Sequence, residues 1–310
     1  MDSKPNDVNT APVHPDGSAD RVCDMRHICP ISGKDSFATA MLLRREDLSL
    51  EYVWHDTGWE LPEVYEWIDK AEKHLKQPIV RCGDDLTEIV AEQGLLPSPM
   101  RRFCTKYAKI KPMNEFIGKQ PFTLYLGLRA DEPDRIAGLH PSKWESHRFP
   151  LRERGLDMPA VWEMVAGAGM LPPLFVWQWM VDRVAELGGR RPEGMQDWEW
   201  WPLFSGRSRP NCDRCFFQRL YEWIWLWETH PDRFKAAVET EESTQHASDF
   251  RWLGKGKPLA EIVNRAEQIK ERRAKQIVRH LNNLNTPRLF GDLVQDNPFG
   301  STSCGLYCGK

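Results

Sequence analysis

One short run of small and charged residues stands where an apolar segment gives way to a helical pattern: Pro30-Ile31-Ser32-Gly33-Lys34-Asp35-Ser36. Small residues let the backbone approach a ligand closely, and the first turn of a helix offers unpaired N–H groups to an anion. Lys34 adds a positive charge and Ser36 adds a hydroxyl. The G-x-x-x-x-G-K-[ST] spacing is absent, which excludes a Walker A loop. The run predicts a cradle for phosphate or sulfate, and the alternative is a plain turn before a helix.

Eight cysteines are present, and two of them form the motif Cys212-Asp213-Arg214-Cys215. A C-x-x-C pair with a remote cysteine such as Cys104 suits an iron–sulfur cluster or zinc, because thiolates are soft ligands. The alternative is that Cys104 is a small buried apolar residue and that the pair is incidental. Spacing alone does not separate these readings.

The elements that must position these residues alternate between strand and helix patterns. We expect strands at 27–31, 50–55, 78–82 and 121–128, and helices at 37–45, 61–75, 86–93 and 106–117. This alternation is typical of βαβ units, so residues 23–150 predict an α/β domain with a Rossmann-like parallel sheet. Ligands bind beyond the carboxyl ends of the strands in such sheets, which is where the run 30–36 lies.

The remainder of the chain has a different character. Ten of the fourteen tryptophans lie between Trp144 and Trp227, and we expect residues 151–254, with the C-x-x-C motif, to form helices and loops packed on the sheet. Residues 258–284 predict one long helix within a basic amphipathic segment, 255–285. That segment is a solvated face or a surface that follows nucleic-acid phosphates. Residues 1–22 and 286–310 predict disordered or flexible tails.

Composition narrows the class of protein. The chain has 310 residues, Lys+Arg 42 against Asp+Glu 45, and a net charge of −3. This balance argues against a polybasic protein that coats nucleic acid or membranes. A run of about 20 apolar residues, which a membrane span needs, is absent. Without an apolar signal-peptide core near the N-terminus we expect a cytoplasmic protein, in which cysteines usually serve metals, clusters or redox chemistry.

Five motifs, in this order, resemble the phosphoadenylyl-sulfate (PAPS) reductase family of the PP-loop, adenine-nucleotide alpha-hydrolase superfamily. Residues 32–36 are similar to the PP-loop S-G-G-K-D-S, although Ile31 and Ser32 stand where the family has Ser and Gly. HDTGWELPEVYE at 55–66 is similar to the segment D-T-G-x-E-x-P-E-T-Y-E. The other three are RFCT with Lys109 and Pro112, LGLRADE at 126–132, and CDRC at 212–215. The resemblance covers about residues 27–218.

The resemblance implies a site, residue by residue. The phosphates would be wrapped by Ser32, Gly33, Lys34, Asp35 and Ser36. The nucleotide pocket would be edged by Asp56, Thr57 and Gly58, and Arg129 would reach toward the anionic end of the nucleotide. Cys104, Cys212 and Cys215 fall where assimilatory adenylyl-sulfate reductases hold a [4Fe–4S] cluster. The family's remaining ligand position holds Thr105, so three of the four ligands remain. Either one iron keeps an open site, which resembles several tRNA thiolation enzymes of this superfamily, or a fourth ligand comes from Cys82, Cys304 or Cys308.

The C-terminal run Ser303-Cys304-Gly305-Leu306-Tyr307 resembles the family's E-C-G-L-H segment, which carries a nucleophilic cysteine. Cys304 would attack the sulfur of the substrate, and Cys308 would be a resolving thiol. Ser303 and Tyr307 replace the Glu and His that flank the family's cysteine. The alternative is a flexible terminus with two exposed thiols.

Three functional hypotheses follow. The first is a sulfonucleotide reductase, in which PAPS or adenylyl sulfate binds the loop, Lys34 and Cys304 act in catalysis, and a thioredoxin-like protein supplies electrons. The second is an ATP pyrophosphatase that uses Mg²⁺ to adenylate a nucleic acid for cluster-dependent sulfur insertion, as in tRNA thiolation or DNA phosphorothioation, with a sulfur donor protein. The third is a nucleotide-sensing module without catalysis.

Overall fold

Five strands form one sheet in the order β3-β2-β1-β4-β5, and each neighbouring pair is parallel. The computed structural model describes residues 25–46, 48–132, 145–208, 212–244 and 250–285. The strands are β1 (Arg26–Pro30), β2 (Leu50–Trp54), β3 (Ile79–Arg81), β4 (Phe122–Tyr125) and β5 (Glu145–Arg148). Because the chain leaves β1 on one side toward β3 and returns on the other side at β4, the crevice between β1 and β4 is the topological switch point. The α/β prediction with a parallel, Rossmann-like sheet is confirmed.

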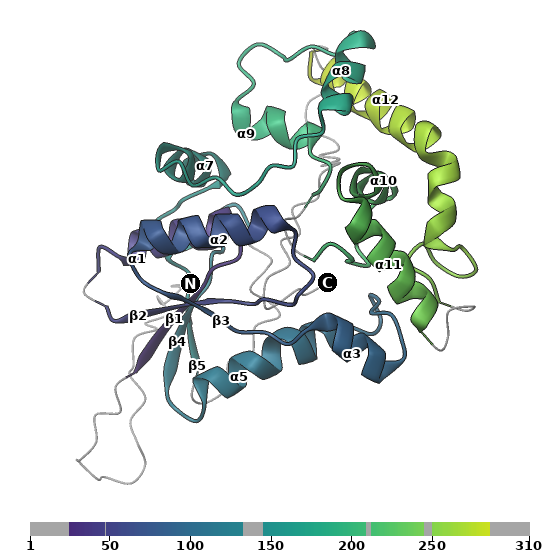
Figure 1. Ribbon diagram of the computed structural model, residues 1–310. Helices are drawn as coiled ribbons and strands as arrows, with labels where there is room; N and C mark the ends of the chain where they lie inside the picture. Colours follow the sequence, from purple (N-terminus) through teal and green to yellow (C-terminus); the bar gives the residue numbers. More distant parts are fainter. Residues whose placement is uncertain (1–24, 47, 133–144, 209–211, 245–249, 286–310) are drawn as a thin grey trace, which may run out of the picture.

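Helices cover both faces of the sheet (Figure 1). The first face carries α1 (Lys34–Leu43) and α2 (Pro62–Leu75). The opposite face carries α3 (Leu86–Gln93), α4 (Phe103–Thr105), the π-helical turn η1 (Lys106–Ile110) and α5 (Lys111–Ile117). Since both faces are covered, the central strands are apolar on both sides: Ile28 and Val53 pack toward α5, and Cys29 and Tyr52 toward α1 and α2.

The second half of the chain is helical, as expected. Its elements are α6 (Pro150–Glu153), α7 (Met158–Gly167), α8 (Gln178–Glu186), α9 (Asp197–Trp200), the 3₁₀ turn η3 (Trp201–Phe204), α10 (Leu220–Thr229), α11 (Pro231–Ser243), the 3₁₀ turn η4 (Leu259–Arg265) and α12 (Ala266–Asn285). α7 packs on α1, and α11 packs against α3. Within the described residues, no helix combines the length and apolar character needed to cross a membrane.

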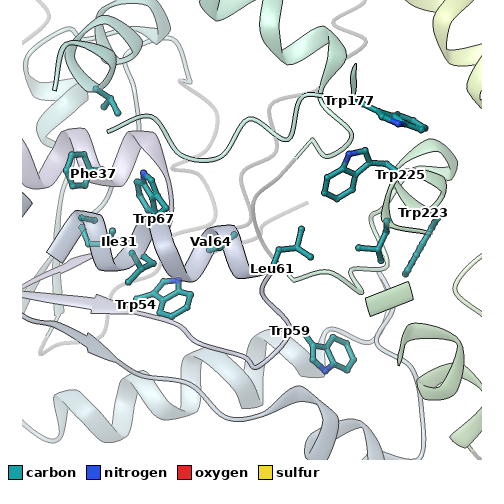
Figure 2. Close-up of a cluster of buried hydrophobic side chains, with 14 of the residues drawn as sticks. Ile31, Phe37, Trp54, Trp59, Leu61, Val64, Trp67, Trp177, Trp223 and Trp225 are labelled. Carbon is teal, nitrogen blue, oxygen red and sulfur yellow. The ribbon is translucent and has the colours of Figure 1, made fainter. Parts of the chain in front are cut away.

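Tryptophans link the two halves through one continuous buried cluster. Figure 2 shows the cluster extending from the sheet side to the later helices through Phe37, Trp54, Trp67, Trp59, Trp177, Trp223 and Trp225. Trp59 meets Trp252 edge to face, with ring centroids 6.3 Å apart. The prediction that most tryptophans are core residues holds for these, while Trp227 is 37% exposed.

Two sequence-based predictions about elements were wrong. β5 was missed, because Glu145-Ser146-His147-Arg148 is a polar edge strand without the apolar signature of its neighbours. The single helix over 258–284 is divided, because a 3₁₀ turn occupies Leu259–Arg265 and the α-helix begins only at Ala266.

The basic segment is not simply a solvated face. Lys270 on α12 is buried and lies 2.8 Å from carboxylate oxygens of both Glu228 and Glu267. Arg273 is also buried and donates to the Leu203 carbonyl at 3.2 Å. These two cations therefore attach the helix to the core. The predicted tails 1–22 and 286–310, with Cys304 and Cys308, lie outside the described residues.

Candidate nucleotide-binding site

The 32–36 loop joins the end of β1 to the first turn of α1 and is shaped by one hydroxyl. Ser36 Oγ accepts hydrogen bonds from the N–H groups of Ser32 (2.8 Å) and Gly33 (3.1 Å) and donates to the Gly33 carbonyl (2.9 Å). A Cβ atom at Gly33 would meet nothing within 4 Å, so the space beside its backbone is open. Ser36 therefore holds the loop in shape, and the open face at Gly33 suits a phosphate group.

Charge at this loop centres on Asp35. Its carboxylate is 2.9 Å from Lys34 Nζ and 3.1 Å from Arg129 Nη1. Arg129 is buried, and it also binds Asp131 through Nε (2.9 Å) and Nη2 (3.2 Å). Burial disfavours the charge of Arg129, but the hydrogen bonds that Arg129 donates to Asp131 and the charges of Asp35 and Glu132 outweigh this effect and raise the pKa of the guanidinium. Arg129 thus contacts the loop through Asp35, and its predicted reach toward the nucleotide stays a prediction.

The loop after β4 passes directly against the 32–36 loop. A Cβ atom at Gly127 would lie 2.7 Å from both the Asp35 carbonyl carbon and the Ser36 nitrogen. No side chain fits there without moving the backbone. Gly127 therefore sets how closely the β1 and β4 loops meet at the switch point.

The loop after β2 is held by its own carboxylates. Asp56 Oδ1 accepts from the Gly58 N–H (3.1 Å) and the Tyr65 hydroxyl (2.8 Å). Thr57 is fully buried and donates to Glu60 twice, from its N–H (3.0 Å) and from Oγ1 (2.8 Å). Asp56 and Gly58 lie just after the carboxyl end of β2, and their role at the nucleotide pocket stays a prediction. Thr57 lies beneath them, and both of its donors are used by Glu60.

The C-x-x-C motif packs against this same loop, although 155 residues separate Thr57 from Cys212. The Cys212 sulfur is 3.5 Å from Thr57 Oγ1 and 3.8 Å from Glu60 Oε1. The Asp213 N–H donates to the Trp59 carbonyl at 2.5 Å. Burial raises the pKa of the Cys212 thiol well above its ordinary value, against an opposing effect of Lys109. Cys212 is therefore a half-buried thiol with a raised pKa beside the candidate nucleotide edge.

Lys109 is a site residue that the sequence prediction did not select. Burial raises the pKa of Glu60 and of Cys212, and the positive charge of Lys109 partly offsets this rise. Burial lowers the pKa of His55, and the same charge lowers it further. It lies on the π-helical turn η1, a conformation frequent at functional sites. The signal that could have identified it is its place in the third motif of the family resemblance, RFCT at 102–105 with Lys109 and Pro112.

The three cysteines predicted to hold a cluster were tested against the donor geometry. Among the residues that the structure describes, no three His, Cys, Asp or Glu side chains form a group that could hold a metal ion. Cys212 and Cys215 influence each other electrostatically, and Cys104 and Cys212 are half-buried residues packed against the main core. This arrangement does not by itself fit a three-thiolate cluster, so we derive no step through one. The [4Fe–4S] cluster and the roles of Cys304 and Cys308 stay predictions.

Comparison with known proteins gives one family-model match, within the first 150 residues. Residues 26–150 match the family model of the phosphoadenosine phosphosulfate reductase domain. Two uncharacterized proteins of Methanocaldococcus jannaschii are similar to part of the chain. MJ0066 is 33% identical over 87 residues, which is 27% of this chain and 18% of that protein. MJ0973 is 28% identical over 88 residues, which is 28% of this chain and 21% of that protein. The chain thus spans about a fifth of the length of the curated relatives it matches.

The family match and the geometry agree. The matched segment contains the parallel sheet, the 32–36 loop at the end of β1, the Asp56–Gly58 edge after β2 and Arg129 after β4. The match confirms the resemblance for the motifs inside this segment: residues 26–150 are a phosphoadenosine phosphosulfate reductase domain, of a PP-loop family.

Proposed function

We propose that this chain is an enzyme of sulfur metabolism that binds an adenine nucleotide at the carboxyl edge of its sheet and reduces a sulfonucleotide, PAPS or adenylyl sulfate, to sulfite. The observation that carries the proposal is the position of the thiol motif. The Cys212 sulfur lies 3.5 Å from the Thr57 hydroxyl, in the loop after β2. Thiols and nucleotide loops thus share one edge, which supports sulfur chemistry on a bound nucleotide.

Phosphate binding is assigned to the PP-loop. The open backbone at Gly33 and the first N–H groups of α1 would receive the phosphate, and Lys34 would supply a positive charge. Asp35, held by Arg129, keeps the lysine beside the loop. Asp56 and Gly58 would border the nucleotide on the β2 side.

The reaction is assigned to the tail cysteine. The Cys304 sulfur would attack the sulfonate sulfur, the bond from that sulfur to the phosphate oxygen would break, and the nucleotide would leave as its phosphate. A second thiol, from Cys308 or from a thioredoxin-like protein, would then attack Cys304 and release sulfite. The two thiols become a disulfide, and the two electrons lost by the thiols reduce the sulfonate to sulfite.

Sulfite release tests this proposal. The purified chain would be incubated with PAPS, adenylyl sulfate and a thioredoxin system, and sulfite would be measured for the parent, Cys304→Ser and Cys308→Ser. We expect Cys304→Ser to lose sulfite release while it binds the nucleotide as the parent does. Full sulfite release by Cys304→Ser would refute the tail mechanism.

A second candidate function is an ATP pyrophosphatase that adenylates a nucleic acid before sulfur insertion. Two carboxylates favour it: Asp35 and Asp131 are held together at the PP-loop by Arg129, and carboxylate oxygens suit the Mg²⁺ that accompanies ATP as substrate. Release of pyrophosphate from MgATP, with no sulfite from PAPS, would select this function. Nucleotide binding without release of sulfite or pyrophosphate would favour the third hypothesis, a nucleotide-sensing module without catalysis.

Metal analysis after anaerobic purification bears on both candidates. About four irons per chain with matching sulfide and a broad band near ~400 nm would support the cluster predicted at Cys104, Cys212 and Cys215. Cys212→Ser would then lower the iron content, whereas Cys29→Ser, a buried cysteine in the middle of β1, would not. Absence of iron and sulfide under strict anaerobiosis would refute the cluster.

A further inference from the structure

His55, the residue immediately after β2, has a buried nitrogen without a partner. Its side chain is 8% exposed, and its Nε2 atom makes no hydrogen bond within the described residues. Buried polar atoms in folded proteins nearly always have partners, so one that lacks them calls for an explanation. A ligand that completes the hydrogen bond is one such explanation.

The register of the sheet locates His55 beside the PP-loop. Pro30 pairs with Val53, and the Ile31 N–H donates to the Val53 carbonyl at 2.7 Å. Continuing this register two residues past the last pair aligns Ser32, the first residue of the loop, with His55. The two residues therefore begin the loops that follow adjacent strands, which lie about 4.8 Å apart, at the carboxyl edge. Ser32 is exposed there, whereas His55 is buried.

The face on which His55 lies follows from strand alternation. Val53 packs toward α5, and the residue two positions later in an extended chain points to the same face. Lys109 on η1 is on this side and acts electrostatically on His55. Burial, with the charge of Lys109, lowers the pKa of the imidazole to about 3. The ring is therefore neutral near pH 7, with one donor and one acceptor nitrogen.

We infer that His55 Nε2 forms a hydrogen bond with an oxygen of the bound nucleotide, where the phosphate group meets the ribose. The inference rests on the proposed nucleotide binding, which it deepens by adding a recognition residue behind the PP-loop. A neutral ring suits this role because it can donate to a phosphoryl oxygen or bond a ribose hydroxyl.

A matched control lies on the same strand. Tyr52 also has a buried hydroxyl without a partner among the described residues, but it packs on the opposite face, within the core under α1 and α2. Tyr52→Phe removes an unpartnered polar atom away from the loop. His55→Leu removes one beside it.

The experiment measures affinity and thermal stability together. ATP and pyrophosphate would be titrated into the parent, His55→Leu, His55→Gln and Tyr52→Phe, and each melting temperature would be recorded without ligand. We expect His55→Leu to bind ATP about 10-fold more weakly, as the loss of one hydrogen bond implies, with an unchanged or higher melting temperature. His55→Gln should recover most of the affinity, and Tyr52→Phe should bind ATP as the parent does.

The pyrophosphate titration identifies the oxygen that His55 contacts. If His55→Leu loses affinity for both ATP and pyrophosphate, the contact is a phosphoryl oxygen. If it loses affinity for ATP alone, the contact is a ribose oxygen. Parent-like ATP affinity in His55→Leu would overturn the inference and leave the proposed function standing. No binding of ATP, PAPS or adenylyl sulfate by the parent would overturn both. If His55→Leu does not fold, His55→Gln and His55→Phe carry the same comparison, and equal ATP affinity in those two variants would overturn the inference.

Discussion

At the scale of single residues, the shared carboxylate of Asp35 decides how the PP-loop meets an anion. Lys34 and Arg129 both contact it, at 2.9 and 3.1 Å. Arg129 has further carboxylate partners and is 2% exposed, so it stays with Asp35 when a ligand arrives. Lys34 has the longer and more flexible stem and can turn toward a phosphate. The ligand-binding charge of the loop is therefore that of Lys34.

Replacing Lys34 by Ala should weaken binding of ATP and PAPS by about 10- to 100-fold, because a charge-assisted hydrogen bond is lost. Isothermal titration of both nucleotides measures the change. The matched control is Lys111→Ala, since Lys111 is 57% exposed on α5 and pairs with Glu115. Parent-like affinity in Lys34→Ala would mean that the loop is not the phosphate site.

His55 gives the free energy of unfolding a specific dependence on pH. Its pKa falls from 6.5 to about 3 on folding, so the unfolded chain binds one more proton than the native chain between those values. Above pH 6.5 the imidazole is mostly neutral in both states, so His55 does not lower the free energy of unfolding. As the pH falls the unfolded chain takes up the extra proton, and at pH 5 the free energy of unfolding is lower by about 2 kcal/mol. Urea unfolding of the parent and His55→Phe at pH 5 and pH 7 measures it. The variant should lose less stability than the parent between the two pH values, and equal losses would contradict the depressed pKa.

How much of the site was predictable differs from residue to residue. Lys34 and Asp35 were predicted from their place between a strand and a helix. Asp56 and Arg129 were predicted from the family resemblance, which their positions just after strands supported. The partners of Thr57 could not be predicted, since its contact with Cys212 depends on how the second half of the chain folds back. Lys109 was missed as a site residue for the same reason: its influence on Glu60 and His55 comes from tertiary packing of η1.

At the scale of elements, the fit of the β1 and β4 loops depends on the absence of a side chain at Gly127. Strand and helix patterns predicted four of the five strands, because those strands contain apolar runs. Three of them, β1, β2 and β4, are largely buried, whereas β3 is an edge strand. β5 escaped prediction because its polar residues make ion pairs, such as Arg148 with Glu153 at 2.6 Å, that appear only in the folded chain.

Gly127→Ala should lower the free energy of unfolding by about 1–3 kcal/mol and weaken nucleotide binding, because its Cβ would collide with the backbone of the PP-loop. Chemical denaturation and ATP titration measure the two effects. The control is Gly167→Ala in α7, where a Cβ meets nothing within 4 Å. That variant should be stabilised by about 0.5–1 kcal/mol through helix propensity. A neutral Gly127→Ala would show that the loops are not in firm contact.

At the scale of the whole molecule, the two halves share one core. The buried cluster runs from Cys29 in β1 to Leu281 in α12, and Trp59 lies between Arg214, 4.6 Å from its ring, and Trp252. The family match ends at residue 150, but the buried cluster continues past that residue into the later helices. The 26–150 segment and the later helices therefore stabilise each other.

We expect the parent to unfold in one cooperative transition. Far-UV circular dichroism reports the helices of both halves, and tryptophan fluorescence reports mainly the later half, so their urea midpoints should coincide. Two separated transitions would contradict a shared core.

The return of Cys212, Asp213 and Trp252 to the loop after β2 has a consequence for biosynthesis. A ribosome that has just made Trp59 must add almost 200 residues before Trp252 exists, which takes roughly 10–40 s at 5–20 residues per second. Until then the Thr57 and Trp59 end of the nascent sheet lacks its cover. Chaperones that recognise exposed apolar segments would therefore encounter this edge during translation, before the nucleotide can meet a finished site.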